Sequence, residues 1–140
     1  MHATVRSVIE VSGEGPADVT ILDTEASPEH LSRGTAMHAD AMLVVVEPYF
    51  KSLETGRRMA ALGTDLGLPR VALVANKMRD ERDEAAVREF AEQHGLEVAG
   101  TIPFDEAMPA AERAGVSPLD HDPGAPSVAA IGELARSFVR

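Results

Sequence analysis

The chain has 140 residues, of which 44% are hydrophobic and 26% are charged, a composition typical of one globular domain. Thirteen Lys and Arg against 23 Asp and Glu give a net charge of -10, which argues against nucleic-acid partners and anionic membrane surfaces. The 140 residues contain no cysteine, no run near the ~20 apolar residues of a membrane span and no signal-peptide pattern. We therefore expect a cytoplasmic protein without disulfides.

The first half of the chain is predicted to alternate between helices and strands. Its elements, in chain order, are a short helix near 5–9, a strand over 19–22, a weak helix over 28–37, a strand over 41–46 and a helix over 52–66. The run over 41–46 is unbroken, apolar and rich in β-branched residues, which predicts a strand buried on both faces.

The second half continues the alternation. Its predicted elements are a doubly buried strand over 70–75, a helix from about Asp80 to Gly95, a strand over 97–102 near an edge, a helix over 106–114 closed by Gly115, a loop over 118–126 and a final helix ending near Phe138. Strands that alternate with helices form βαβ units. The predicted fold class is α/β: one domain over 1–140, with a mainly parallel sheet of about four strands and helices on both faces.

A short motif follows each predicted strand. These motifs are Asp23, Glu47 with Pro48, Asn76 with Lys77, and the run Pro103, Phe104, Asp105. Taken singly, each is more often a cap or a turn residue than a ligand, and Asp105 in particular suits the start of a helix. The carboxyl ends of parallel strands share one face of a sheet, where ligands bind. Their joint occurrence there therefore favours a binding site.

The order of motifs resembles the MinD/ParA-like class of P-loop ATPases, and within it the CooC-type nickel-insertion ATPases that mature carbon monoxide dehydrogenase. The stretches that carry the resemblance are VTILDTEA, EHLSRGT, AMLVVVEP, SLETGRRM, VALVANK, GTIPFDEAMPAAERAG and SPLD. The most specific part is DTEA followed by EHLSRGT. The resemblance covers nearly the whole chain and implies ATP or ADP with magnesium as ligands.

The resemblance also gives individual residues a role. Asp23 matches the Walker B aspartate, which holds magnesium, usually through water. Asn76 matches the residue that reads the adenine edge, and Lys77 flanks it. Three residues, Ile102, Pro103 and Phe104, match the segment whose backbone lines the adenine pocket, and Asp105 follows in the same loop. An amide side chain can donate to and accept from a purine edge at once, which suits Asn76 for this role.

The chain departs from this class in its phosphate grip. It has no GxxxxGK[ST] motif, whose backbone N–H groups and lysine hold phosphates. The resemblance begins after the P-loop unit of the family. The family's Cys-x-Cys pair is also absent, and Ser27 stands where glycine is usual after DTEA. We therefore expect a P-loop NTPase-like fold without its N-terminal unit, and no hydrolysis by this chain alone.

Three functional interpretations remain open at this point. The first is a maturation ATPase for metal-centre assembly, completed by self-association or by a partner chain that carries the P-loop, with a metalloenzyme as client. The second is a non-catalytic relic that binds a protein partner or regulates a full-length paralogue. The third, a response-regulator receiver, fits the order of acidic residues and lysines poorly. A metal site at Glu25 and His30 is less favoured than exposed polar residues.

Overall fold

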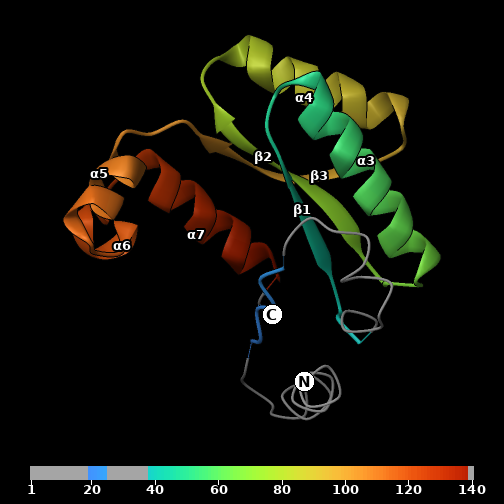
Figure 1. The fold of residues 1–140 in the computed structure, drawn as a ribbon, viewed down its shortest axis with the longest axis horizontal. Coiled ribbons are helices and arrows are strands. Elements are labelled where there is room, and N and C mark those ends of the chain that lie inside the picture. The colour runs from blue at the N-terminus through green and yellow to red at the C-terminus, as the bar shows by residue number, and fades with distance from the viewer. Residues whose placement is uncertain (1–18, 25–37, 139–140) are drawn as a thin grey trace.

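The chain forms layers of helices on the two faces of a parallel sheet (Figure 1). A computed structural model describes residues 19–24 and 38–138. The helices and strands are β1 (Met42–Val46), α3 (Phe50–Asp65), β2 (Val71–Met78), α4 (Glu81–Gln93), β3 (Glu97–Pro103), α5 (Ala107–Ala114), α6 (Pro118–His121) and α7 (Pro126–Phe138). Among these described helices, none combines the length and the apolar character needed to cross a bilayer.

The sheet has the strand order β1-β2-β3, and both strand pairs are parallel. Two helices, α3 and α4, pack on one face, and α7 packs against β3 on the other, while α5 and α6 extend beside the sheet (Figure 1). The predicted α/β class, the parallel pairing and the helices on both faces are thus confirmed. The described residues contain three strands, one fewer than expected.

The core is centred on β2. Four successive residues of this strand, from Ala72 to Ala75, are buried, because β2 has a strand on each side and helices above and below. Leu73 joins Val46 of β1 and Val87 of α4 in one apolar cluster. The prediction of a doubly buried strand here is confirmed.

Two glycines let α3 lie close to the sheet. A Cβ atom on Gly56 would collide with Cγ1 of Val46, and one on Gly63 would lie 2.7 Å from Sδ of Met42. Glycine is ordinarily unfavourable inside a helix, so its presence at these two buried positions reflects the close approach of α3 to β1.

The helix boundaries follow from their capping residues. Asp80 accepts hydrogen bonds from the backbone N–H groups of Arg82 (2.9 Å) and Asp83 (3.0 Å), which fixes the start of α4 as predicted. Gly115 adopts a left-handed φ of 67° and ends α5. The expected loop over 118–126 is wrong in its first part, because Ser117 accepts from the N–H of Asp120 and caps the short helix α6.

Two further expectations need correction. Residues 19–22 form no strand, and Val19 and Ile21 are 62% and 87% exposed. A short apolar run becomes a strand only where a neighbouring strand and an apolar cover are available, and no described element supplies them here. The helices predicted near 5–9 and over 28–37 lie outside the described residues.

The second correction concerns β1. Val44 and Val46 face α3 and are buried, whereas Leu43 and Val45 are 40% and 59% exposed on the opposite face. Because α7 packs on β3, it leaves this face of β1 without full cover. The strand is therefore buried on one face only within the described part of the chain.

Candidate functional site

The structure brings several of the predicted site residues together at the carboxyl edge, the edge where the chain leaves β1, β2 and β3. Asn76 and Lys77 lie near the end of β2, and Ile102 and Pro103 lie at the end of β3. Met78 pairs with Pro103, and the carbonyl of Met78 accepts a 2.8 Å hydrogen bond from the N–H of Phe104. The two segments that the resemblance assigns to adenine are therefore direct neighbours.

The β2 strand departs from regular pairing at Asn76 and Lys77. Ala75 pairs with Thr101 and Met78 pairs with Pro103, so two residues of β2 face the single residue Ile102. This is a β-bulge, which re-aims side chains and is common beside functional sites. Lys77 has a φ of 60°, which is rare for a residue with a Cβ atom. We call this pair of residues the 76–77 bulge.

Glu47, the residue that follows β1, forms an ion pair with Lys77 of the 76–77 bulge. The Nζ of Lys77 donates to Oε1 of Glu47 at 2.9 Å, and this bond lowers the pKa of Glu47 and raises the pKa of Lys77. The N–H of Glu47 donates to Oγ of Ser52 in the first turn of α3 at 2.9 Å. The neighbouring Glu47 carboxylate also raises the pKa of Tyr49. The sequence placed Glu47 at this edge but gave it no partner.

Arg79 and Phe104 form a second link across the edge. The Arg79 guanidinium lies 4.6 Å from the centre of the Phe104 ring, within the range of a cation–π interaction. The ring is still 39% exposed, and the N–H of Arg79 donates to Asp83. Sequence reasoning missed Arg79, since a lone arginine after a strand carries no recognisable signal.

Asp105 is engaged within the protein. Its Oδ1 accepts from the N–H of Ala107 at 2.9 Å, and its Oδ2 accepts from the N–H and Oγ of Ser127 at 3.1 and 3.0 Å. The backbone N–H groups of Ala107 and Ser127 lower the pKa of Asp105. The carboxylate thus joins the start of α5 to the start of α7, which agrees with the capping role considered beside the nucleotide role. The sequence gave no sign of the buried Ser127.

Asp23 lies apart from this edge. In Figure 1 the segment 19–24, drawn in blue, lies near the C-terminal end of α7, whereas β1 and β2 end toward the top of the view. Within residues 19–24 and 38–138, no three His, Cys, Asp or Glu side chains gather as a metal site. The magnesium role of Asp23 stays a prediction, and Ser27, Glu25 and His30 lie outside the described residues.

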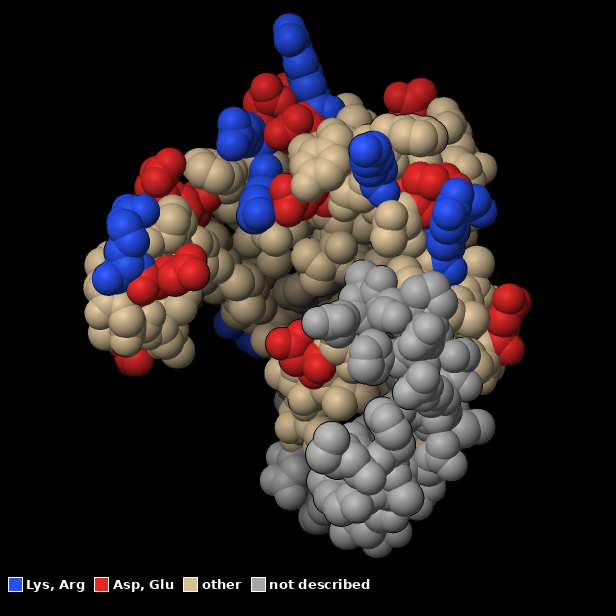
Figure 2. Space-filling view, viewed as in Figure 1, with Lys and Arg blue, Asp and Glu red and all other residues tan. Residues whose placement is uncertain are grey.

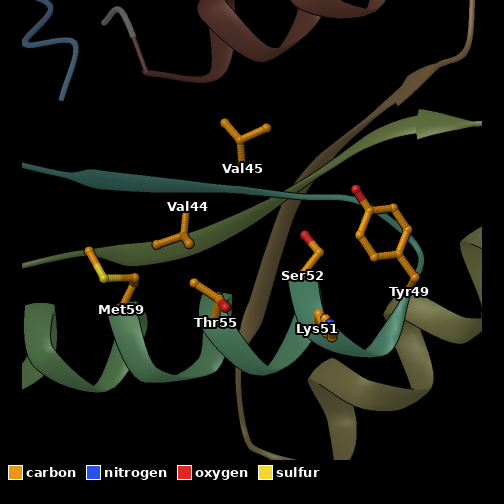
Figure 3. Close-up of a pocket in the computed structure, with 8 residues that line it drawn as sticks. Val44, Val45, Tyr49, Lys51, Ser52, Thr55 and Met59 are labelled. Carbon is orange, nitrogen blue, oxygen red and sulfur yellow. The ribbon is translucent and has the colours of Figure 1, made fainter. Parts of the chain in front are cut away.

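A shallow cavity of about 340 Å³ lies between β1 and α3, beside the Glu47 end of the edge. Figure 3 shows Val44, Met59, Thr55 and Ser52 bordering it, while Val45 points to the other face of β1. The lining is largely apolar, with Ser52, Thr55 and Lys51 near the start of α3. This cavity does not contain Asn76 or Phe104, so it is distinct from the predicted adenine site.

Charges of both signs alternate on the face seen in Figure 2. Among the described residues, Glu54 accepts from Arg57 at 2.6 Å and from Arg58 at 3.3 Å. The hydrogen bond from Arg57 is the main cause that lowers the pKa of Glu54 to about 2. Arg57 and Arg58 are thus bound to a carboxylate of their own helix.

Comparison with known proteins identifies relatives of this chain, although no family model matches it. It is 35% identical over 122 residues to the carbon monoxide dehydrogenase accessory protein CooC of Rhodospirillum rubrum. It is 44% identical over 91 residues to an uncharacterized ATP-binding protein of Methanocaldococcus jannaschii. These matches cover 87% and 65% of this chain, but only 46% and 35% of the relatives. The chain thus spans about half or less of their length.

Solved structures confirm the fold. The MinD cell division protein of Aquifex aeolicus matches 99% of this chain and 60% of its own, with a TM-score of 0.81 and 21% identity. The septum site-determining protein MinD of Pyrococcus horikoshii, solved in complex with Mg-ADP, matches 98% of this chain and 56% of its own, with a TM-score of 0.69 and 18% identity. This chain therefore has the fold of the MinD cell division proteins, and CooC is among the proteins to which its sequence is similar.

Proposed function

We propose that this chain supplies the adenine-reading part of a CooC-like ATPase that acts in metal-centre assembly in the cytoplasm. One observation carries the proposal: the 76–77 bulge and the segment from Ile102 to Phe104 lie side by side at the carboxyl edge. Ligands of open parallel sheets bind at this edge. The sequence likeness to CooC and to ATP-binding proteins supports the nature of the ligand.

The chemistry of the edge suits a purine. Asn76 is partly buried, and its amide can both donate to and accept from the edge of an adenine ring. The backbone from Ile102 to Phe104 follows directly beside it, and the exposed part of the Phe104 ring offers an apolar surface. These groups would hold a base while contributing little to the binding of phosphates.

The 140 residues lack the groups that usually bind the phosphates of a nucleotide. The 140 residues contain only two lysines, Lys51 and Lys77, and neither lies in a glycine-rich loop. A P-loop supplied from outside these residues would therefore be needed for hydrolysis. Asp23 offers a single carboxylate, and the described residues do not by themselves fit a magnesium ion, so no step is assigned to one.

Calorimetry with adenosine and ATP tests the proposal. We expect both to bind with similar, weak affinity, no tighter than roughly millimolar, because the base makes the contacts. Asn76→Ala should weaken adenosine binding, whereas Gln93→Ala, on the exposed end of α4, should leave it unchanged. Equal adenosine binding by both variants would contradict the role of Asn76, and ATP binding much tighter than adenosine would reveal a separate phosphate site.

A second function, a non-catalytic partner of another protein, is supported by the exposed face of β1. Leu43 and Val45 are apolar, adjacent on that face and only partly covered. Such a face favours association. A protein that associates through this face but binds no adenosine would favour the second function over the first.

A further inference from the structure

The 76–77 bulge holds an unfavourable backbone conformation. Lys77, with φ at 60°, is the one non-glycine residue in the left-handed region among residues 19–24 and 38–138. A residue with a Cβ atom keeps this conformation only where its surroundings determine it. The contacts of the bulge therefore indicate what maintains it.

The bulge is held from both neighbouring strands. From β1, the carboxylate of Glu47 accepts from Nζ of Lys77 at 2.9 Å. Glu47 is itself anchored, since its N–H donates to Oγ of Ser52 and its side chain is only 30% exposed. From β3, the N–H of Phe104 donates to the carbonyl of Met78, the residue after the bulge.

We infer that Glu47 is a positioning residue, whose ion pair with Lys77 sets the conformation of the 76–77 bulge and so the orientation of Asn76. The expected effect of Glu47 on adenosine binding rests on the proposed function, whereas the ion pair between Glu47 and Lys77 is present without a ligand. Glu47 touches no predicted base-binding atom. It acts through Lys77, and Asn76 precedes Lys77 directly in the chain.

The first test needs no ligand. We expect Glu47→Gln to shift the backbone amide signals of Asn76, Lys77 and Met78 in a ¹H–¹⁵N correlation spectrum. Glu54→Gln is the matched control, because it also removes a paired carboxylate, from Arg57 on α3, but lies away from the bulge. Unchanged signals at residues 76–78 in the Glu47→Gln variant would overturn the inference.

The second test uses a glycine in place of the strained lysine. Glycine adopts a φ near 60° without strain, so Lys77→Gly should keep the bulge without the ion pair. Adding Glu47→Gln to Lys77→Gly should then change neither the amide signals nor the adenosine affinity, whereas Glu47→Gln alone should weaken adenosine binding about three- to tenfold. An equal effect of Glu47→Gln in both backgrounds would show that Glu47 acts by another route.

The experiments distinguish a failure of the positioning role of Glu47 from a failure of the proposed function. Adenosine binding that is insensitive to Glu47→Gln would overturn the positioning role and leave the proposed function standing. Absence of adenosine binding by the unaltered chain would count against the proposed function, and the amide signals would still decide whether Glu47 sets the bulge.

Discussion

The close approach of α3 to β1 gives a sharp prediction at Gly56. In a free helix, replacing glycine by alanine stabilises by about 1 kcal/mol. Here the new methyl group would overlap Cγ1 of Val46, which is 1% exposed and belongs to a β-branched side chain with little freedom to move. Overpacking of this kind costs about 1–3 kcal/mol. With the helix gain subtracted from this cost, we expect Gly56→Ala to destabilise the protein by up to about 2 kcal/mol.

Urea unfolding followed by circular dichroism measures this change. The matched control is Gly132→Ala on α7, where the added Cβ would meet only Nη1 of Arg136, at 3.5 Å. This control should gain about 0.5–1 kcal/mol, so the two substitutions should have opposite signs. In a Val46→Ala background, which removes the overlapping methyl groups, the cost of Gly56→Ala should largely disappear.

Equal stabilisation by both alanines would refute the reasoning. It would mean that α3 does not lie on β1 as closely as described, and that the cavity between them has a different shape. A cost of Gly56→Ala that persists in the Val46→Ala background would instead point to a contact other than Val46.

Three other predictions address activity, pH and association. The purified chain should show no magnesium-dependent ATP turnover, because no lysine-bearing glycine-rich loop stabilises the transferring phosphate; turnover that Asp23→Ala abolishes would show otherwise. Asp105 has a pKa below its ordinary value of 3.8, so its stabilising effect is complete above about pH 4 and is lost as the pH falls through the lowered pKa. Asp105→Asn should therefore flatten the dependence of the unfolding midpoint on pH in this acid range, and an unchanged acid profile would contradict the role of the Ala107 and Ser127 hydrogen bonds. Finally, burial of the exposed β1 face should favour self-association by about 25 cal/mol for each Å² of apolar surface. Sedimentation at micromolar concentration should therefore show a dimer or larger species, and Val45→Lys should convert it to a monomer. A monomer without the substitution would contradict this expectation.

The parts of the fold that the sequence predicted well are those with local signals. Asp80 before an amphipathic stretch marks the start of α4, Gly115 marks the end of α5, and the run through Leu73 is apolar enough to identify a central strand. Such signals act within one turn or one strand, so neighbouring residues suffice to identify them.

The parts that the sequence did not predict depend on contacts between distant residues. The bulge at Lys77 needs Glu47, 30 residues earlier, and the role of Asp105 needs Ser127, 22 residues later. The run Val19 to Leu22 has the apolar, β-branched pattern of a strand but finds no pairing partner among the described residues. A single sequence without aligned relatives contains no signal for any of these pairings.

The bond between Asp105 and Ser127 has a consequence for how this fold can be varied. The Asp105 carboxylate joins the two ends of the segment that contains α5 and α6, because its Oδ2 accepts from the N–H of Ser127 at 3.1 Å and from Oγ of Ser127 at 3.0 Å. Ala111 inside this segment is fully buried yet lies outside the main apolar cluster, and α5 packs against α6. Because the ends of this segment are already joined, its length can change at little entropic cost to the sheet. Residues 108–122 are therefore a natural position for grafting another peptide while the carboxyl edge is preserved.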